Sequence, residues 1–394
     1  MLMLDPASAV WMDERLYSVV IVRGVEAHPL HHRTGTPLSA YQRNNPVHVK
    51  TVSILLALFG LVLITAFTAW LGAGAVVKAV LSVGFGGFAI LVLWQVASCV
   101  VLALAWRVSC PRPLLDIGIA RLLLARLVRE AGTTCLPFSQ IGGILIGMRA
   151  TCFGFGRTLS WPTAAAANVV DITAEIIGQI AFVLLGLLFL LDRNPGSELA
   201  GPVVLGMILG MAAIAAFIWA QRRAGGLLRR CIGFLSNRLA GQFLSDAMLG
   251  GIDKLQERRD AFYARPGRIV GASLVHLVGW LASAVWVWLA YRLLGAPLSL
   301  GSAVAIEGVA SGILSVSFLM PAALGVQEAA YVALGSLFGL DPHLSFGLSL
   351  LRRGRDLAIG APTLLFWQWM EVLRLRRDAR AASAAGAALD QLAP

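Results

Sequence analysis

Long runs without a charged side chain constrain this sequence more than any other feature. Between Lys78 and Arg107, for example, there is no Asp, Glu, Lys or Arg. An α-helix rises about 1.5 Å per residue, so about 20 apolar residues cross the roughly 30 Å of hydrocarbon in a bilayer. The 394 residues are 58% apolar and 13% charged, with a mean hydropathy of +0.78. These values predict an all-α fold, that of a polytopic membrane protein.

The apolar runs predict about eight transmembrane helices within one membrane domain, residues 50–377. The leader 1–49 is polar and the tail 378–394 is Ala-rich, so both are expected to be disordered. A cluster of His28, His31 and His32 in the leader has no acidic or cysteine partner, so no metal site is expected there. The five cysteines form no CxxC pair and are expected to be free thiols. The predicted spans are 50–71, 80–106, 163–191, 201–220, 269–291, 300–320 and 326–340, with a last one ending near residue 370.

Lys and Arg collect before the first span and after the second, fourth and last spans. Cytoplasmic loops carry an excess of Lys and Arg, so both termini are predicted to face the cytoplasm. The basic segment 221–268 predicts either amphipathic helices that bind anionic lipid at the inner surface or an ordinary positively charged linker. The net charge of +11 is thereby accounted for, and nucleic-acid binding is not expected.

Two apolar segments are interrupted by proline and glycine. Pro137, Gly142 and Gly143 punctuate residues 136–153, which we interpret as a re-entrant hairpin. Pro321 and Gly325 interrupt the corresponding part of the second half. Interrupted segments at matching places in two halves indicate the substrate site of a transporter, since broken helices leave backbone groups facing a cavity. The layout therefore predicts two broken-helix hinges and a two-half pseudo-repeat in arrangement, although not in residue identity.

A polar stripe lies within the span predicted at 163–191. Asn168, Asp171, Glu175 and Gln179 are spaced by three, four and four residues, which places them on one face of a helix. An ionised carboxylate within the bilayer costs at least a few kcal/mol unless it is paired, hydrated or protonated. The stripe therefore predicts a cavity or a basic partner, and its two like charges favour coupling to a proton or a cation. A purely structural hydrogen-bonding seam between helices is the alternative.

Further charges lie inside apolar stretches of both halves. Glu307 shares a helical face with two serines, and Glu328 follows Gly325 at a helix start, where capping is its alternative role. Arginine binds phosphate through its planar fork, so arginines with carboxylates predict a cavity for a zwitterionic or anionic lipid headgroup. His276, alone on an apolar span, is expected to be a packed core histidine. The candidate substrate-binding residues are Arg149, Asn168, Asp171, Glu175, Gln179, Glu307, Gln327, Glu328, Arg352, Arg353, Arg355 and Asp356.

Several of these segments together resemble a known family. The runs 129–132, 136–143, 170–175, 318–328 and 351–357 are similar to HpnL-type membrane proteins associated with hopanoid biosynthesis. These belong to the superfamily named after the transmembrane region of lysylphosphatidylglycerol synthase, and the similarity covers about residues 50–377. The resemblance implies a flippase-like module in the bacterial inner membrane. It implies no aminoacyl transfer, because that reaction belongs to a separate soluble domain that is not expected after Arg380.

The predicted function is therefore transport of a polar-headed lipid, such as a hopanoid or its precursor, through a charged cavity in the membrane. No catalytic residue, cofactor or metal is expected, and no GxxxxGK[ST] run is present. One alternative is an intramembrane enzyme that acts on a lipid or isoprenoid with the carboxylate pair. The other is a non-transporting accessory subunit that joins lipid-biosynthesis proteins in a complex.

Overall fold

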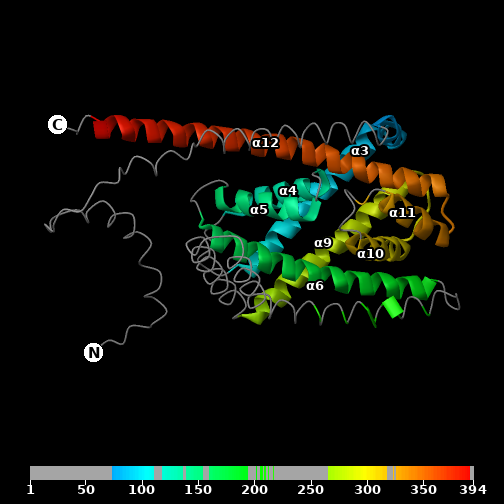
Figure 1. Cartoon of the computed structure of the whole chain (residues 1–394). Coiled ribbons are helices and arrows are strands. Elements are labelled where there is room, and N and C mark those ends of the chain that lie inside the picture. The colour runs from blue at the N-terminus through cyan, green and yellow to red at the C-terminus, as the bar shows by residue number, and fades with distance from the viewer. Residues whose placement is uncertain are drawn as a thin grey trace, which may run out of the picture. The chain divides into compact units, whose positions relative to one another are not determined.

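The computed structural model describes residues 73–110, 118–135, 139–153, 159–193, 265–316, 323 and 325–390, with isolated positions between 201 and 216. Several predicted segments lie outside these residues. They are the leader, the span 50–71, most of the span 201–220, most of the linker 221–268, and the two prolines Pro137 and Pro321. The described part contains eight α-helices and no strand (Figure 1), which confirms the all-α prediction. The helices are α3 (Ala73–Ser109), α4 (Ile119–Cys135), α5 (Ser139–Phe153), α6 (Trp161–Arg193), α9 (Pro266–Leu293), α10 (Leu300–Val316), α11 (Val326–Leu337) and α12 (Pro342–Asp390).

Three described helices are long and apolar enough to cross a membrane, namely α3, α6 and α9. They contain 37, 33 and 28 residues, which correspond to about 55, 50 and 42 Å. Each therefore exceeds the hydrocarbon thickness of a bilayer, and each includes a predicted span. Within α3 the backbone kinks at Gly84, whose φ of 72° favours glycine. The chain is thus a polytopic helical membrane protein.

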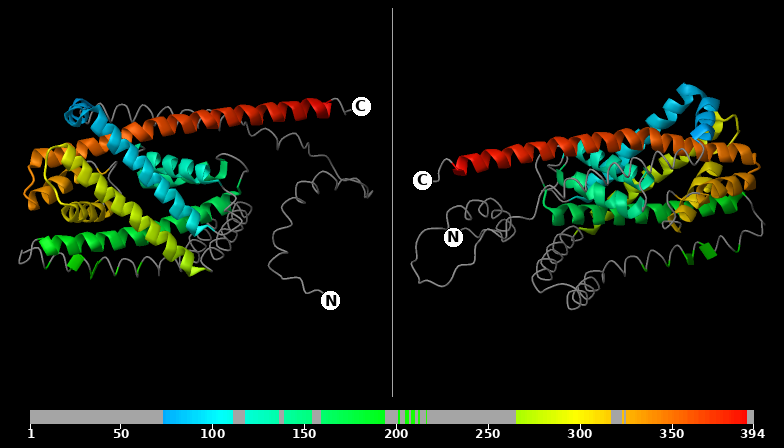
Figure 2. Two further views of the ribbon diagram at one scale, coloured as in Figure 1. Left: turned by 180° about the vertical axis from the view of Figure 1, so that it is seen from behind. Right: turned by 45° about the horizontal axis from the view of Figure 1, so that its top comes forward.

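Helices α3 and α9 lie side by side (Figure 2) and exchange indole hydrogen bonds. Trp94 Nε1 donates to the Ala282 carbonyl at 2.8 Å, and Trp286 Nε1 donates to the Leu91 carbonyl at 3.0 Å. A carbonyl already bonded within its helix can accept a second hydrogen bond, so these contacts satisfy two N–H groups in an apolar setting. The α3–α9 pair is one wall of the candidate site.

Helix α6 approaches its neighbours through glycines. A Cβ on Gly186 would lie 2.8 Å from Gly308 Cα of α10, and a Cβ on Gly178 would lie 2.8 Å from the Ser273 carbonyl of α9. Small residues allow this close approach, which is typical of helix packing in membranes. Helix α6 is therefore held tightly against α9 and α10.

The region predicted as a re-entrant hairpin has a different structure. Gly142 and Gly143 lie inside one helix, α5, rather than at a break, so the prediction of a hairpin within residues 136–153 and of hinges at these glycines is wrong. Helix α5 packs instead against the preceding helix α4. A Cβ on Gly143 would lie 2.7 Å from the Arg129 carbonyl, and a Cβ on Gly132 would lie 2.8 Å from Gly143 Cα. Glycine is needed here because two backbones touch.

The helix pair α4–α5 lies between α12 and α6 in the views of Figures 1 and 2. Contacts of α4 with α12 and of α5 with α6 agree with this arrangement. Helices α4 and α5 contain 17 and 15 residues, about 26 and 22 Å, so each is shorter than the hydrocarbon thickness. The charged side chains of α4 therefore lie beside the longer apolar helix α6.

The second half contains short helices before a very long one. Helix α10 ends at Val316, and α11 begins after Gly325, whose φ is 76°. Helix α11 has only 12 residues, about 18 Å, which is too short to cross a bilayer alone as predicted for 326–340. Helix α12 continues for 49 residues through Pro362 to Asp390, so the tail predicted to be disordered is helical up to that residue.

Candidate functional site

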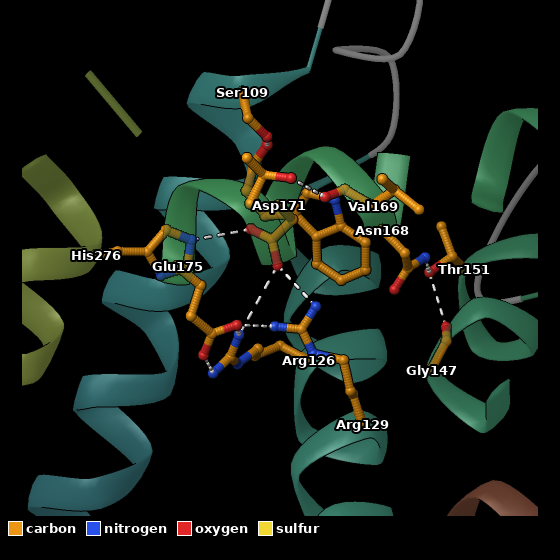
Figure 3. A network of polar contacts seen from close by, with 12 residues as sticks. Ser109, Arg126, Arg129, Gly147, Thr151, Asn168, Val169, Asp171, Glu175 and His276 are labelled. Carbon is orange, nitrogen blue, oxygen red and sulfur yellow. Dashed lines mark hydrogen bonds and ion pairs between the residues drawn. The ribbon is translucent and has the colours of Figure 1, made fainter. Parts of the chain in front are cut away.

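The two carboxylates predicted within the membrane bind two arginines of α4 (Figure 3). Arg129 Nη1 donates to Asp171 Oδ2 at 2.8 Å, and Arg129 Nη2 donates to Glu175 Oε2 at 2.5 Å. Arg126 donates to both oxygens of Glu175, from Nη1 at 2.8 Å and from Nη2 at 2.5 Å. The i,i+3 spacing of the arginines and the i,i+4 spacing of the carboxylates place each pair on one helix face. The result is a cross-linked set of charge-assisted hydrogen bonds between α4 and α6.

Burial within this set is uneven. Asp171 is fully buried and the two arginines are 3 and 4% exposed, whereas the Glu175 side chain is 20% exposed. Glu130, one helical turn after Arg126, lies 3.3 Å from its Nη2 and has a side chain that is 39% exposed. We call Arg126, Arg129, Glu130, Asp171 and Glu175 the α4–α6 ion cluster. Its accessible edge is formed by two carboxylates, while its guanidiniums lie inside.

Two other helices complete the surroundings of the cluster. His276 of α9 lies with its Nε2 3.1 Å from Asp171 Oδ1, and both side chains are fully buried. The Arg129 guanidinium carbon lies 5.5 Å from the centre of the Trp106 ring of α3, a cation–π geometry. The prediction that His276 is only a packed core histidine therefore needs correction, because it is a polar partner of Asp171.

A second group of charges joins α10, α11 and α12. Arg352 Nη1 donates to Glu307 Oε1 at 2.8 Å and contacts the Tyr331 hydroxyl, which donates to Glu307 Oε2 at 2.6 Å. Glu307 and Tyr331 are fully buried. Glu307 is thus a buried carboxylate with a partner on each oxygen.

Glu328 combines both roles that the sequence suggested. Its Oε2 accepts the Gly325 backbone N–H at 2.9 Å, which caps α11, and its Oε1 accepts from Arg353 Nε at 2.6 Å. The adjacent Gln327 donates to the Ser349 carbonyl at 3.3 Å, also on α12. The short helix α11 is therefore attached to α12 by side chains at its first turn.

The last members of the predicted arginine cluster face α3. Arg355 donates to Asp356 Oδ1 at 2.6 Å and to Gln95 Oε1 at 2.9 Å, and its guanidinium lies 4.5 Å from the centre of the Trp286 ring. Successive α12 arginines thus point to different helices, since each residue turns by about 100°. Together with the Glu307 and Glu328 pairs, these contacts satisfy the charges that interrupt an apolar stretch.

Arg149 lies apart from both groups. It donates to Glu371 of α12 from Nε at 3.0 Å and from Nη2 at 3.1 Å, and its side chain is 40% exposed. The sequence suggests Arg149 and the cluster at 352–356 as the basic partners of the α6 carboxylates. This prediction is wrong, because Arg149 pairs with Glu371 and the cluster pairs with Glu307, Glu328 and Gln95. The contact of Arg149 joins α5 to α12.

The polar stripe of α6 does not face a single space. Asn168 donates to Thr151 Oγ1 of α5 at 3.3 Å and to the Ala164 carbonyl at 2.8 Å. Gln179 donates to Ser315 Oγ of α10 at 2.8 Å. Only the middle two members, Asp171 and Glu175, share partners, so the two ends of the stripe are hydrogen-bonding contacts between helices.

The sequence does not identify several of these partners, among them Arg126, Arg129, Glu130, Glu371 and Tyr331. Arg126 and Arg129 were counted among the cytoplasmic charges that set orientation, but both are buried here. The sequence does contain a signal for these two arginines. Leu122, Ala125 and Val128 recur every three residues, which predicts a helix with an apolar face and not a loop, and all three are buried in the structure.

Among the described residues, no group of His, Cys, Asp and Glu has a geometry suited to a metal ion. Cys99, Cys110, Cys135 and Cys152 are free thiols, and Cys231 lies outside the described residues. The site that the structure offers is therefore one of guanidiniums, carboxylates, one imidazole and aromatic rings.

Comparisons with known proteins place the chain in a family. Neither the curated proteins nor the solved structures include a match. The model of one protein family, described as the lysylphosphatidylglycerol synthase TM region, matches residues 54–362. That match spans most of the chain and includes helices α3 to α11 and the first part of α12, whereas Glu371 lies beyond it. The chain therefore belongs to the lysylphosphatidylglycerol synthase transmembrane-region family and is a membrane protein of a lipid-handling family.

Proposed function

We propose that the protein moves a polar-headed lipid between the two leaflets of a bacterial inner membrane, with the α4–α6 ion cluster as the headgroup site. The observation that carries the proposal is the burial of Arg126 and Arg129, which are only 3 and 4% exposed and lie against apolar helices. The more accessible carboxylates Glu130 and Glu175 lie in front of them. A headgroup crossing about 30 Å of hydrocarbon needs polar groups in place of water.

Exchange of partners is the mechanism that this geometry supports. A lipid phosphate has the bidentate geometry of the carboxylate that it would replace on Arg126, and a headgroup amine would bind the Glu175 carboxylate so released. The number of paired charges stays constant during such an exchange. The barrier is then smaller than that for moving an unpaired headgroup through hydrocarbon, while the acyl chains or the hopanoid ring system stay in the bilayer.

Translocation in reconstituted vesicles tests this proposal. Purified protein is placed in liposomes that contain a fluorescent headgroup lipid, and the rate at which inner-leaflet lipid becomes accessible to an external quencher is measured. Glu175→Gln should slow translocation at least about tenfold, because the neutral amide loses the charge-assisted contact with the headgroup amine, which is worth about 1.5–3 kcal/mol. Asp192→Asn is the matched control on the same helix, since the Asp192 side chain is 77% exposed, and it should behave as the wild type.

Two results would contradict the proposal. One is a wild-type protein that leaves the lipid distribution unchanged, and the other is a Glu175→Gln protein as fast as the wild type. Mass spectrometry of the same vesicles separates transport from enzymatic modification of the lipid, for which we expect no product. A stable partner that co-purifies, together with tolerance of neutralised charges, would favour an accessory subunit.

The finer features of the proposal rest on the resemblance to HpnL-type proteins and on charge distribution. They are a hopanoid or hopanoid precursor as the substrate, cytoplasmic termini, anionic lipid bound at the basic segment 221–268 and contacts with lipid-biosynthesis proteins. Competition by an unlabelled hopanoid in the vesicle assay tests the first of these. Labelling of single cysteines at the two ends of the chain tests the orientation.

A further inference from the structure

The charges of the α4–α6 ion cluster do not balance. Two guanidiniums face three carboxylates, so the five residues together carry a formal charge of −1. Glu130 is 39% exposed and reaches water, whereas Asp171 is fully buried, where a negative charge is costly unless basic groups neutralise it. A further basic group, His276, contacts the cluster and could neutralise its excess negative charge on protonation.

His276 contacts the most buried member of the cluster. Its Nε2 lies 3.1 Å from Asp171 Oδ1, and neither side chain is exposed. An ionised carboxylate only accepts hydrogen bonds, so a neutral His276 must carry its hydrogen on Nε2. Its Nδ1 then presents a lone pair, and this atom has no hydrogen-bond partner in the described part of the chain. Proton uptake at Nδ1 makes His276 a cation and brings the total charge of the group to zero.

We infer that Asp171 and His276 form a buried proton-binding site. The same balance holds if the proton resides on Asp171 and its hydroxyl donates to Nε2, so the pair as a whole takes up one proton. The charged and titratable groups around His276 come from each helix that packs on α9. On α6 they are Asp171 and Glu175, with Arg126, Arg129 and Glu130 of α4 behind them. Cys110, just after the end of α3, lies near Asp171. On α10, Glu307 is engaged by Arg352 and Tyr331, and on α12, Arg355 lies over Trp286.

Protonation of this pair weakens the ion pair between Asp171 and the Arg129 guanidinium. Asp171 accepts from Arg129 on Oδ2 at 2.8 Å while it contacts His276 through Oδ1. A proton on the pair weakens the attraction between Asp171 and Arg129, so Arg129 becomes available to another anion. If the proposed function holds, that anion is the lipid phosphate. Binding of the proton and binding of the phosphate then favour each other equally, as linkage requires.

The proton site can be tested without transport. Infrared difference spectra of the protein in lipid nanodiscs, taken between about pH 5 and pH 8, report protonation of imidazole and carboxyl groups. We expect a pH-dependent change in the wild type that is lost in both His276→Gln and Asp171→Asn. Ser273→Ala, one turn away on α9, is the control for folding and should keep the wild-type spectrum. Identical spectra for the wild type and a folded His276→Gln protein would overturn the inference.

Coupling is tested in vesicles with an imposed pH gradient. With one proton per lipid, a gradient of one pH unit should sustain about a tenfold difference in labelled anionic lipid between the leaflets. The His276→Gln protein should sustain none, and Ser273→Ala should match the wild type. Translocation by the wild type that ignores the gradient would overturn the coupling. If no variant moves lipid at all, the proposed function fails, and the infrared result still decides whether the proton site exists.

Discussion

Replacing Arg129 by glutamine should destabilise the protein by about 3–5 kcal/mol. The substitution removes the 2.8 Å contact with Asp171, which is fully buried, and the 2.5 Å contact with Glu175. A buried charge that loses its partner keeps the cost of desolvation without the Coulombic gain, which explains the size of the effect. The measurement is the temperature at which the monodisperse fraction in detergent falls by half, determined by size-exclusion chromatography after heating.

Two further variants separate charge pairing from simple loss of a side chain. The double variant Arg129→Gln with Asp171→Asn should recover a large part of the loss, because neither remaining group is charged. Arg149→Gln should cost less than Arg129→Gln, since the Arg149 side chain is 40% exposed and its pair with Glu371 is screened. Equal losses for the two arginines, or no recovery in the double variant, would show that the α4–α6 pairs do not hold these helices together.

Alanine at Gly143 and alanine at Gly347 should have opposite effects. A Cβ at Gly143 would lie 2.7 Å from both the Arg129 carbonyl and the Thr133 backbone nitrogen, so α4 and α5 must separate. Overpacking of this kind costs about 1–3 kcal/mol, and more where backbone blocks relaxation. At Gly347, within α12, nothing lies within 4 Å, and alanine should stabilise the helix by up to about 1 kcal/mol.

The same heating experiment measures both glycine variants. If the protein moves lipid as proposed, translocation should also fall in Gly143→Ala, because α4 carries Arg126 and Arg129 to the proposed headgroup site. A Gly143→Ala protein as stable as the wild type would mean that α4 and α5 are not in backbone contact. A destabilised Gly347→Ala protein would mean that a neighbour outside the described residues covers that position.

The α6 part of the site could be predicted from the sequence because its pattern is local. Asp171 and Glu175 are one turn apart in an apolar helix, and that spacing alone places them on one face. Their partners could not be predicted in the same way. Arg126 and Arg129 lie more than 40 positions earlier, in a segment whose charge resembles a cytoplasmic loop, and only the packing of α4 on α6 brings them together.

The broken segments show the same limit. Proline and glycine mark both an interrupted helix and a close helix contact, and the sequence does not distinguish these uses. Gly325 has the positive φ of a break, whereas Gly143 is helical and is required by the approach of α4. Glu328 was open to two interpretations for a similar reason, since a carboxylate at a helix start both caps that helix and reaches a cation on a neighbour.

Helix α12 connects the charged group of α10 and α11 with the separate Arg149–Glu371 pair. Arg352, near one end, holds Glu307 of α10, and Glu371, about 28 Å further along, holds Arg149 of α5. A tilt of about 5° around the first contact would displace the second by about 2–3 Å, enough to break its hydrogen bonds. Pro362 lies midway and lacks a backbone N–H, so bending there would separate the two motions. A movement of α10 or α11 would therefore be transmitted through α12 to α5, and bending at Pro362 would reduce that transmission.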